Sequence, residues 1–329
     1  MIEAVAVAVA PPDSRRRTVM SGRCSSPTAS ELAKRTTAPT GERSARSDES
    51  APPLRTREDL SRTPEPDIVD APAVKAVALI TPPTPDARPE TRRYGAVQRQ
   101  RFRDAKPINF GKRKPADYAV HGVDVSRWQG EIDWAKLRSQ GANFAYIKAT
   151  DGGDHLDPMF RKNWREADRA GLKRGAYHFF YWCRSASSQA DWFIRNVPKD
   201  PNALPPVIDV EWNHLSSCKK RPSRATVIEK MQVFMDKLEA HYGQRPVIYT
   251  APDFYGDNLR NAFQNYPFWL RAVAQHPSKV YPGRDWVFWQ YSGSGLSHGV
   301  RGRIDLNVFA GSESDWRRWL GKQERIASN

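Results

Sequence analysis

Aromatic residues are almost absent from the first third of this 329-residue sequence. Residues 1–116 contain only Tyr94, Phe102 and Phe110, whereas all 11 Trp lie after residue 117. The same segment holds 15 of the 26 Pro and is rich in Arg, Ser, Thr and Ala. Such a composition offers too little apolar surface to offset the entropy that a chain loses on ordering. We therefore expect residues 1–116 to form a disordered tail or linker, and folding to begin at residue 117.

Long hydrophobic runs are also missing. The first residues, MIEAVAVAVAPP, are apolar over only about half a membrane span, and Glu3 stands where a signal peptide has positive charge. A second apolar patch, APAVKAVALI, is interrupted by Lys75. We expect no transmembrane segment, and a targeting role for the first residues stays open.

Cysteine is scarce, with Cys24, Cys183 and Cys218 at no spacing that is typical of a metal site. Cys183 and Cys218 each follow one of two consecutive predicted strands, and the ends of neighbouring parallel strands lie side by side. A Cys183–Cys218 disulfide is one interpretation, and two unrelated buried thiols are the other. A disulfide would indicate an oxidising compartment. We expect no metal and no cofactor.

The net charge of +15 is not concentrated in one segment. Residues 1–116 carry 22 basic and 14 acidic side chains, and residues 117–329 carry 30 and 23. No zinc-finger spacing or long basic helix accompanies the excess, and the tail has almost no aromatic residues on which bases could stack. We therefore expect no nucleic-acid partner. An anionic polymer such as a bacterial envelope, or a plainly solvated basic surface, fits this charge.

Strand-like and helix-like segments alternate after residue 117. This alternation predicts a mainly parallel sheet with right-handed crossovers. Eight strands in under 200 residues predict a closed α/β barrel in which some helices are missing, and residues 312–329 are expected to be a helical extension. The predicted strands lie in residues 118–126, 143–150, 174–182, 205–212, 245–251, 267–273, 286–293 and 302–309, and the clearest helices in 133–141, 157–171, 185–197 and 223–243.

Two carboxylates follow each other closely in the strand-like segment VIDVEW. Asp209 and Glu211 are two residues apart and therefore share one face of the strand, about 6–7 Å from each other. Crowding of this kind lets one carboxyl keep its proton near neutral pH. A protonated and an ionised carboxyl are what hydrolysis of a glycosidic bond requires. A solvated edge, a salt-bridged structural pair and a Mg²⁺ or Ca²⁺ site are the alternatives.

Aromatic residues near the predicted strand ends favour a sugar-binding site over these alternatives. Flat apolar sugar faces stack on aromatic rings while carboxylates act on the linkage. Asp124 and Asp305 also lie at or near strand ends, where barrels gather their functional groups. The aromatic residues are Trp128, Tyr177, Phe179, Tyr181, Trp212, Tyr249, Trp289 and Tyr291.

Several motifs together resemble the family 25 glycoside hydrolases, which are lysozymes that cut the β-1,4 bond from N-acetylmuramic acid to N-acetylglucosamine in peptidoglycan. The resemblance covers about residues 118–311, and its motifs occur in the family's order. The family implies a modified TIM-like (β/α) barrel with a reduced number of helices, peptidoglycan as the partner, and a site without a metal. The motifs are GVDVSRWQGEIDW, FAYIKATDG, RGAYHFFYW, VIDVEW, PVIYTA, FWLRAVA, FWQYSGSG and GRIDLNVF.

The resemblance also implies roles for individual residues. Glu211 matches the general acid, and Asp209 matches the carboxylate that stabilises the developing positive charge. Asp124 and Asp305 match acids that orient the sugar or partner residues. The family implies retention of anomeric configuration, by a covalent intermediate or by substrate assistance. Tyr177, Tyr249 and Trp289 match site aromatics, and we expect Phe179, Trp212 and Tyr291 to bind substrate with them.

A catalytically inactive peptidoglycan-binding barrel is the main alternative, and it predicts substitution at Glu211 or Asp209, both of which are present. The expected location is the cell envelope, in the periplasm, or outside the cell. We expect a monomer. The sequence does not distinguish remodelling of the cell's own wall from attack on other walls.

Overall fold

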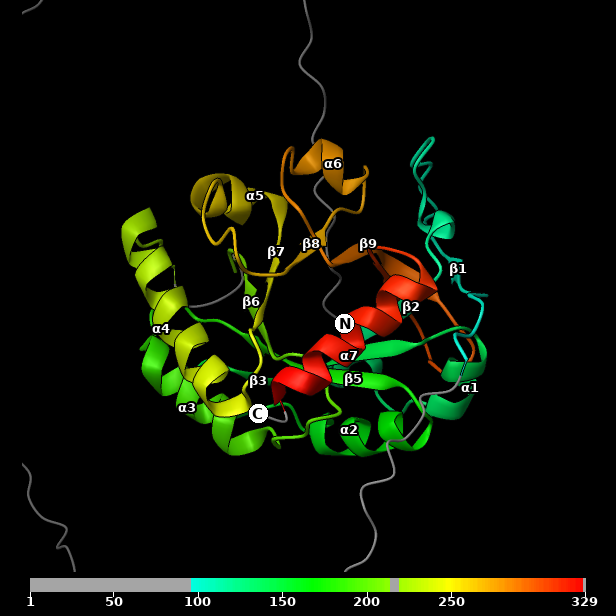
Figure 1. Ribbon diagram of the computed structural model, residues 1–329, viewed down its shortest axis with the longest axis horizontal. Helices are drawn as coiled ribbons and strands as arrows, with labels where there is room; N and C mark the ends of the chain where they lie inside the picture. The colour runs from blue at the N-terminus through cyan, green and yellow to red at the C-terminus, as the bar shows by residue number, and fades with distance from the viewer. Residues whose placement is uncertain (1–95, 214–218, 328–329) are drawn as a thin grey trace, which may run out of the picture. The chain divides into compact units, whose positions relative to one another are not determined.

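The computed structural model of the protein describes residues 96–213 and 219–327, with side chains up to residue 322. These residues all lie in one compact unit, Pro83–Asn329. Figure 1 shows a barrel of strands with helices around it. The strands are β1 (Arg103–Asp104), β2 (His121–Val125), β3 (Phe144–Asp151), β4 (His155–Leu156), β5 (Lys173–Phe179), β6 (Val207–Val210), β7 (Val247–Thr250), β8 (Phe268–Arg271), β9 (Phe288–Leu296) and β10 (Ile304–Phe309). The helices are α1 (Trp134–Ser139), α2 (Phe160–Arg169), α3 (Ala186–Asn196), α4 (Arg224–Tyr242), α5 (Pro252–Phe254), α6 (Pro277–Val280) and α7 (Glu313–Ala327), with short turns η1 (Pro115–Asp117), η2 (Arg127–Gln129) and η3 (Tyr255–Leu259).

Eight of the strands close into a barrel in the order β2, β3, β5, β6, β7, β8, β9 and β10. Neighbours from β2 to β9 are parallel. The closing strand β10 is antiparallel to both β9 and β2. Each of the eight predicted strands is present, so the prediction of a modified TIM-like (β/α) barrel is confirmed.

The late connections of the barrel contain less helix than the early ones, as predicted. The connections before β7 contain α1 to α4, whereas only α5, η3 and the four-residue α6 lie between β7 and β9. The longest of the early helices, α4, begins after Ser223, whose side chain accepts a hydrogen bond from the Thr226 amide, and ends at Gly243, which has a positive φ of 69°. In the described part of the chain, no helix combines the length and apolar character that crossing a bilayer requires.

Large aromatic side chains fill the amino-terminal half of the barrel interior. Phe144 and Tyr146 of β3 are fully buried there. Their neighbours on the adjacent strands are Gly122 and Gly175. A Cβ atom at Gly122 would lie 2.5 Å from the Phe144 ring, and one at Gly175 would lie 2.3 Å from the Tyr146 ring. The two glycines therefore leave the space that the Phe144 and Tyr146 rings occupy inside the barrel.

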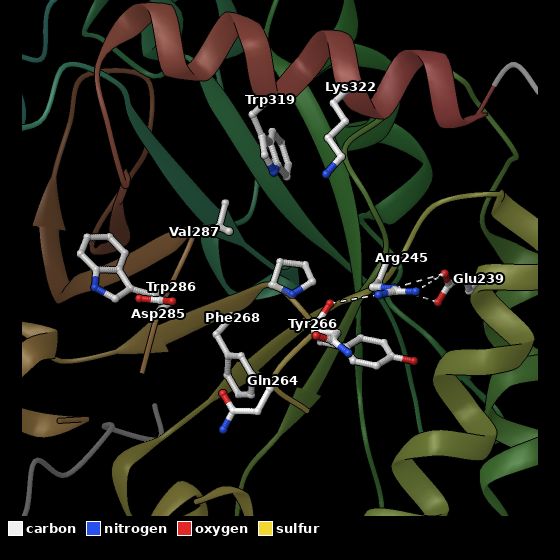
Figure 2. Close-up of a pocket in the computed structure, with 12 residues that line it drawn as sticks. Glu239, Arg245, Gln264, Tyr266, Phe268, Asp285, Trp286, Val287, Trp319 and Lys322 are labelled. Atoms are coloured by element: carbon white, nitrogen blue, oxygen red, sulfur yellow. Dashed lines mark hydrogen bonds and ion pairs between the residues drawn. The ribbon is translucent and has the colours of Figure 1, made fainter. Parts of the chain in front are cut away.

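The predicted C-terminal helix is present as α7 and packs against the same aromatic core. Trp316 of α7 is buried against Phe144 and Phe309, with ring centroids 5.6 and 5.0 Å apart. Trp319 and Lys322 of α7 point into a pocket of about 430 Å³ that Arg245 also lines (Figure 2). Most of the residues that line this pocket directly precede β7, β8 or β9. The pocket is therefore at the amino end of these strands, opposite the strand-end acids.

Residues 96–117, which we term the amino-terminal strap, pack against the outside of the barrel. Strand β1 pairs with Gly295 and Leu296 of β9, and Phe102 is only 8% exposed. The Phe110 ring meets the Trp289 ring edge-on at 5.1 Å. This corrects the expectation for residues 96–116, because hydrogen bonds such as that from the Arg101 amide to the Gln140 carbonyl attach the segment together with its two aromatic side chains. Residues 1–95 lie outside the described residues.

One of the cysteines can be placed. Cys183 follows the segment Phe180–Trp182 after β5 and takes part in a disulfide. The other two, Cys24 and Cys218, lie outside the described residues. The Cys183–Cys218 pairing therefore stays a prediction.

Candidate active site

The four predicted acids come together inside the carboxyl end of the barrel. Asp124 lies near the end of β2, Asp209 near the end of β6, and Glu211 directly after β6. Asp305 lies at the start of β10 and pairs in register with Asp124, because β10 runs in the opposite direction. Each of the four acids is close enough to at least one other to alter a pKa within the group.

A chain of hydrogen bonds fixes Asp124. Asn307 Nδ2 and Gln290 Nε2 donate to Asp124 Oδ2 at 2.7 and 3.0 Å. Tyr249 Oη donates to Gln290 Oε1 at 2.9 Å, and Trp269 Nε1 donates to Asn307 Oδ1 at 2.8 Å. All four partners are buried, so the orientation of the Asp124 carboxyl is set by the barrel core.

Gln290, Asn307 and Trp269 were not among the residues predicted from the sequence. A signal for them exists in the alternation of the strands, because residues two apart on a barrel strand face the same side. Asn307 is two residues from Asp305 on β10, and Gln290 pairs in register with Asn307 from β9. Once one strand is known to direct an acid inward, its polar neighbours at even spacing are candidates as well.

Burial raises the pKa of every acid in the group. Burial raises the pKa of Asp124 to about 6, although its hydrogen bonds from Gln290 and Asn307 oppose the shift. Burial likewise raises the pKa of Glu211 to about 7, with Arg271 opposing. The pKa values of Asp209 and Asp305 are also raised, by burial and then by the charges of Glu211 and Asp124 respectively. The group therefore retains protons near neutral pH.

Two cations on other strands of the barrel act on these acids. Arg271, the last residue of β8, lowers the pKa of Glu211, and Lys148 of β3 lowers that of Asp209. Lys148 Nζ lies 2.6 Å from Asp151 Oδ2 and 5.3 Å from the centroid of the Phe179 ring. Phe179 pairs in register with Asp209, which places the ammonium beside that carboxyl. Neither cation was among the residues predicted from the sequence.

Replacing Lys148 by Met should move the pH profile of activity toward higher pH. Loss of the ammonium raises the pKa values of both Asp209 and Glu211. Asp209 therefore becomes charged only at higher pH, and Glu211 keeps its catalytic proton up to a higher pH. We expect kcat/KM below neutral pH to fall roughly tenfold to a hundredfold. Lys148→Arg, which keeps the charge, is the matched control. A lower rate with an unshifted profile would show that Lys148 acts only through packing.

Three of the six predicted aromatic residues lie with the acids. Tyr249 pairs in register with Asp209, and Phe179 pairs with Asp209 from the other side. The charges of Asp124, Asp209 and Asp305 raise the pKa of Tyr177, after burial as the main cause. Tyr177 and Phe179 keep partial exposure, so their rings are accessible from the carboxyl end. Their role in substrate binding stays a prediction.

The other three, Trp212, Trp289 and Tyr291, lie on the outer face of the barrel. Trp212 is 9% exposed and donates from Nε1 to Asp257 Oδ2 at 2.8 Å. Trp289 is fully buried and donates to the Ala272 carbonyl, and Tyr291 packs against it. This corrects their expected position, because residues adjacent to an inward-facing Glu211 or Gln290 must point outward. They contribute to the outer core and not to the acid group.

The arrangement supports proton transfer and stabilisation of positive charge by carboxyl groups. Asp209 Oδ1 is buried without a hydrogen-bond partner among the described residues, so one oxygen of this carboxyl is an unsatisfied acceptor. Within residues 96–213 and 219–327, no group of three or more His, Cys, Asp or Glu side chains is arranged to hold a metal ion.

Comparisons with known proteins agree with this geometry. The uncharacterized protein YegX of Escherichia coli K12 is 40% identical over 225 residues, which cover 67% of this chain and 80% of that protein. Lysozyme M1 of Streptomyces globisporus is 35% identical over 259 residues, covering 74% and 85%. The structure of a family 25 glycosyl hydrolase from Bacillus anthracis matches with a TM-score of 0.59 and 39% identity, covering 63% of this chain and 95% of that one. The family model for glycosyl hydrolases family 25 matches residues 123–300, and the chain belongs to this family of glycoside hydrolases.

Proposed function

We propose that the protein is a lysozyme that cleaves the β-1,4 bond between N-acetylmuramic acid and N-acetylglucosamine in peptidoglycan. One observation carries the proposal: Asp209 and Glu211 lie two residues apart at the carboxyl end of β6, and the pKa of Glu211 is raised to about 7. A lysozyme from Streptomyces globisporus among its relatives supports the choice of substrate. Hydrolysis of a glycosidic bond by two carboxyl groups supports the choice of reaction.

In this proposal Glu211 is the general acid. With a pKa of about 7, its carboxyl is substantially protonated near neutral pH, and its partial exposure allows contact with the glycosidic oxygen. Donation of that proton gives the leaving sugar its hydroxyl group. The resulting carboxylate then accepts a proton from the water that completes hydrolysis, so Glu211 returns to its starting form.

Asp209 stabilises the positive charge that develops on the sugar ring as the bond breaks. Its carboxylate, near the carboxyl end of β6, would face the anomeric carbon or the substrate's 2-acetamido group. Lys148 favours the charged form of Asp209 by lowering its pKa. Asp124 and Asp305 hold the sugar hydroxyls, since Asp124 is itself fixed by Asn307 and Gln290. Both routes for Asp209 lead to retention of anomeric configuration.

The remaining expectations follow from this activity. The partner is the glycan strand of peptidoglycan, which places the site of action outside the cytoplasmic membrane, in the cell envelope or beyond it. A catalytic site within a single closed barrel acts on a polymer without a second subunit, so we expect a monomer. Nucleic acid is not part of the proposal.

Analysis of new chain ends tests the function directly. The full-length protein is incubated with purified bacterial peptidoglycan, the products are reduced with borohydride, and the reduced sugar is identified by mass spectrometry. We expect N-acetylmuramic acid at the new reducing ends. New N-acetylglucosamine ends would overturn the assigned bond. Binding to peptidoglycan without new ends would instead favour an inactive wall-binding barrel.

A further inference from the structure

Trp128 is exposed to an extent that no other Trp in the protein approaches. All 11 Trp lie among the described residues, and Trp128 is 72% exposed whereas the rest are buried or half-buried. An indole left in water forgoes the free energy that burial of so large an apolar surface provides. The position of the ring therefore needs an explanation outside the packing of the core.

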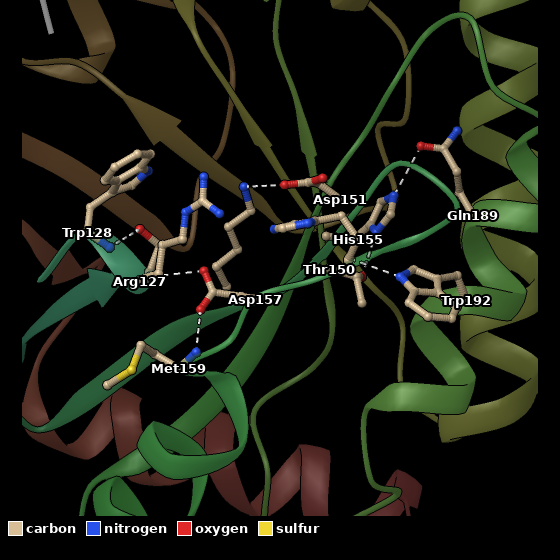
Figure 3. A network of polar contacts seen from close by, with 12 residues as sticks. Arg127, Trp128, Thr150, Asp151, His155, Asp157, Met159, Gln189 and Trp192 are labelled. Atoms are coloured by element: carbon tan, nitrogen blue, oxygen red, sulfur yellow. Dashed lines mark hydrogen bonds and ion pairs between the residues drawn. The ribbon is translucent and has the colours of Figure 1, made fainter. Parts of the chain in front are cut away.

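The turn that carries Trp128 is held in place from several sides. Turn η2 follows β2, and Ser126 and Gln129 cap it reciprocally: Gln129 Oε1 accepts from the Ser126 amide at 2.8 Å. The Arg127 amide donates to Asp157 Oδ2 at 2.9 Å, and these residues lie beside each other in Figure 3. Gln129 Nε2 donates to the Arg303 carbonyl. The exposed ring thus extends from an ordered backbone.

A cation occupies one face of the ring. The Arg127 guanidinium lies 4.6 Å from the centroid of the Trp128 ring. Cation–π contact of this kind restrains the indole and leaves the other face to solvent. A restrained, flat apolar face is suited to the C–H face of a pyranose ring. The nearby guanidinium, which is a hydrogen-bond donor only, can donate to sugar hydroxyls or carboxylates.

The exposed Trp128 ring lies within reach of the acids. Asp124 and Trp128 are four residues apart, so their Cα atoms are separated by at most roughly 14 Å. Both are at the carboxyl end of β2, and Arg303, which accepts from Gln129, is two residues before Asp305. A short oligosaccharide bound over the acids can therefore reach the ring.

We propose that Trp128 and Arg127 form a stacking platform, distinct from the acid group, for a sugar ring of the glycan strand beyond the cleaved linkage. This inference rests on the proposed function for the class of substrate. Trp128 contributes the stacking face, and Arg127 restrains it and contacts polar groups of the same sugar. The platform favours long strands over short fragments, because only a long strand occupies the acids and the platform together.

Kinetics on substrates of different length test the platform. We expect Trp128→Ala to raise KM for long glycan strands roughly tenfold, with kcat and the rate on the shortest cleavable fragment unchanged. Trp128→Phe should recover part of the loss. Val233→Ala, which alters another exposed apolar side chain on the distant helix α4, is the control and should change nothing. Equal KM values for Trp128→Ala and the parent on long strands would overturn the platform.

Fluorescence gives a second reading that does not depend on turnover. In a Glu211→Gln background, iodide should quench the exposed Trp128 most, and Trp128→Phe should remove that component. A peptidoglycan-derived hexasaccharide should protect it, whereas a disaccharide should not. Normal turnover without protection would overturn the platform and leave the lysozyme intact. Absence of turnover in the parent protein would overturn the proposed function and the platform with it.

Discussion

Replacing Glu211 by Gln should lower kcat by roughly 10²–10⁴-fold while peptidoglycan binding is kept. Gln has the same shape as the protonated acid but cannot release a proton to the glycosidic oxygen. Release of soluble muropeptides measures the rate, and sedimentation with insoluble peptidoglycan measures the binding. Glu239→Gln on α4, at the opposite end of the barrel, is the matched control and should retain full activity. A near-normal rate in Glu211→Gln would remove Glu211 from its proposed role.

The same substitution should stabilise the fold at alkaline pH, which separates loss of catalysis from loss of structure. The folded-state pKa of Glu211 is raised from 4.5 to about 7, so the folded protein binds this proton more tightly than the unfolded chain does. Its contribution to stability is therefore present below the unfolded value and is lost as the pH rises through about 7. Gln stays neutral. Thermal unfolding should show a higher Tm for Glu211→Gln than for the parent at pH 8, and similar values at pH 4.

Phe102→Ala should lower the free energy of unfolding by about 3 kcal/mol. Phe102 belongs to the amino-terminal strap and is only 8% exposed in the outer core, next to the strand pairing of β1 with β9. Removing its ring leaves a cavity between the strap and the barrel. Urea denaturation of the full-length protein, followed by Trp fluorescence, measures the change.

Ile108→Ala is the matched control for this effect, because Ile108 lies in the same strap but is 46% exposed. We expect it to change the free energy of unfolding by no more than about 0.5 kcal/mol. If Phe102→Ala were as harmless as Ile108→Ala, the strap would contribute nothing to the fold, and residue 117 would be restored as the start of the folded unit.

Much of the site was predictable because it lies on strands with clear sequence patterns. Asp209 and Glu211 are spaced by the period of a strand, and the alternation of strands and helices requires that the ends of β2 and β6 share one end of a barrel. The motifs, in their order, indicated the family, and the resemblance to that family implied roles for Asp124 and Asp305. Local patterns of this kind can be predicted from the sequence because each depends on residues only a few positions apart.

The tertiary structure decided what depends on distant segments. The pairing of β9 with β10 determines which face of β9 points inward. As a result, Trp289 and Tyr291 lie in the outer core and Gln290 lies in the site. The raised pKa of Glu211 comes from burial, which has no local signature in the sequence. The strap packs because Trp289, far along the chain, presents a ring to Phe110. By itself, then, the sequence determined the strands, their order and the four acids. Long-range packing alone decided which residues face inward, how far burial raises the pKa values of the acids, and that residues 96–116 pack against the barrel.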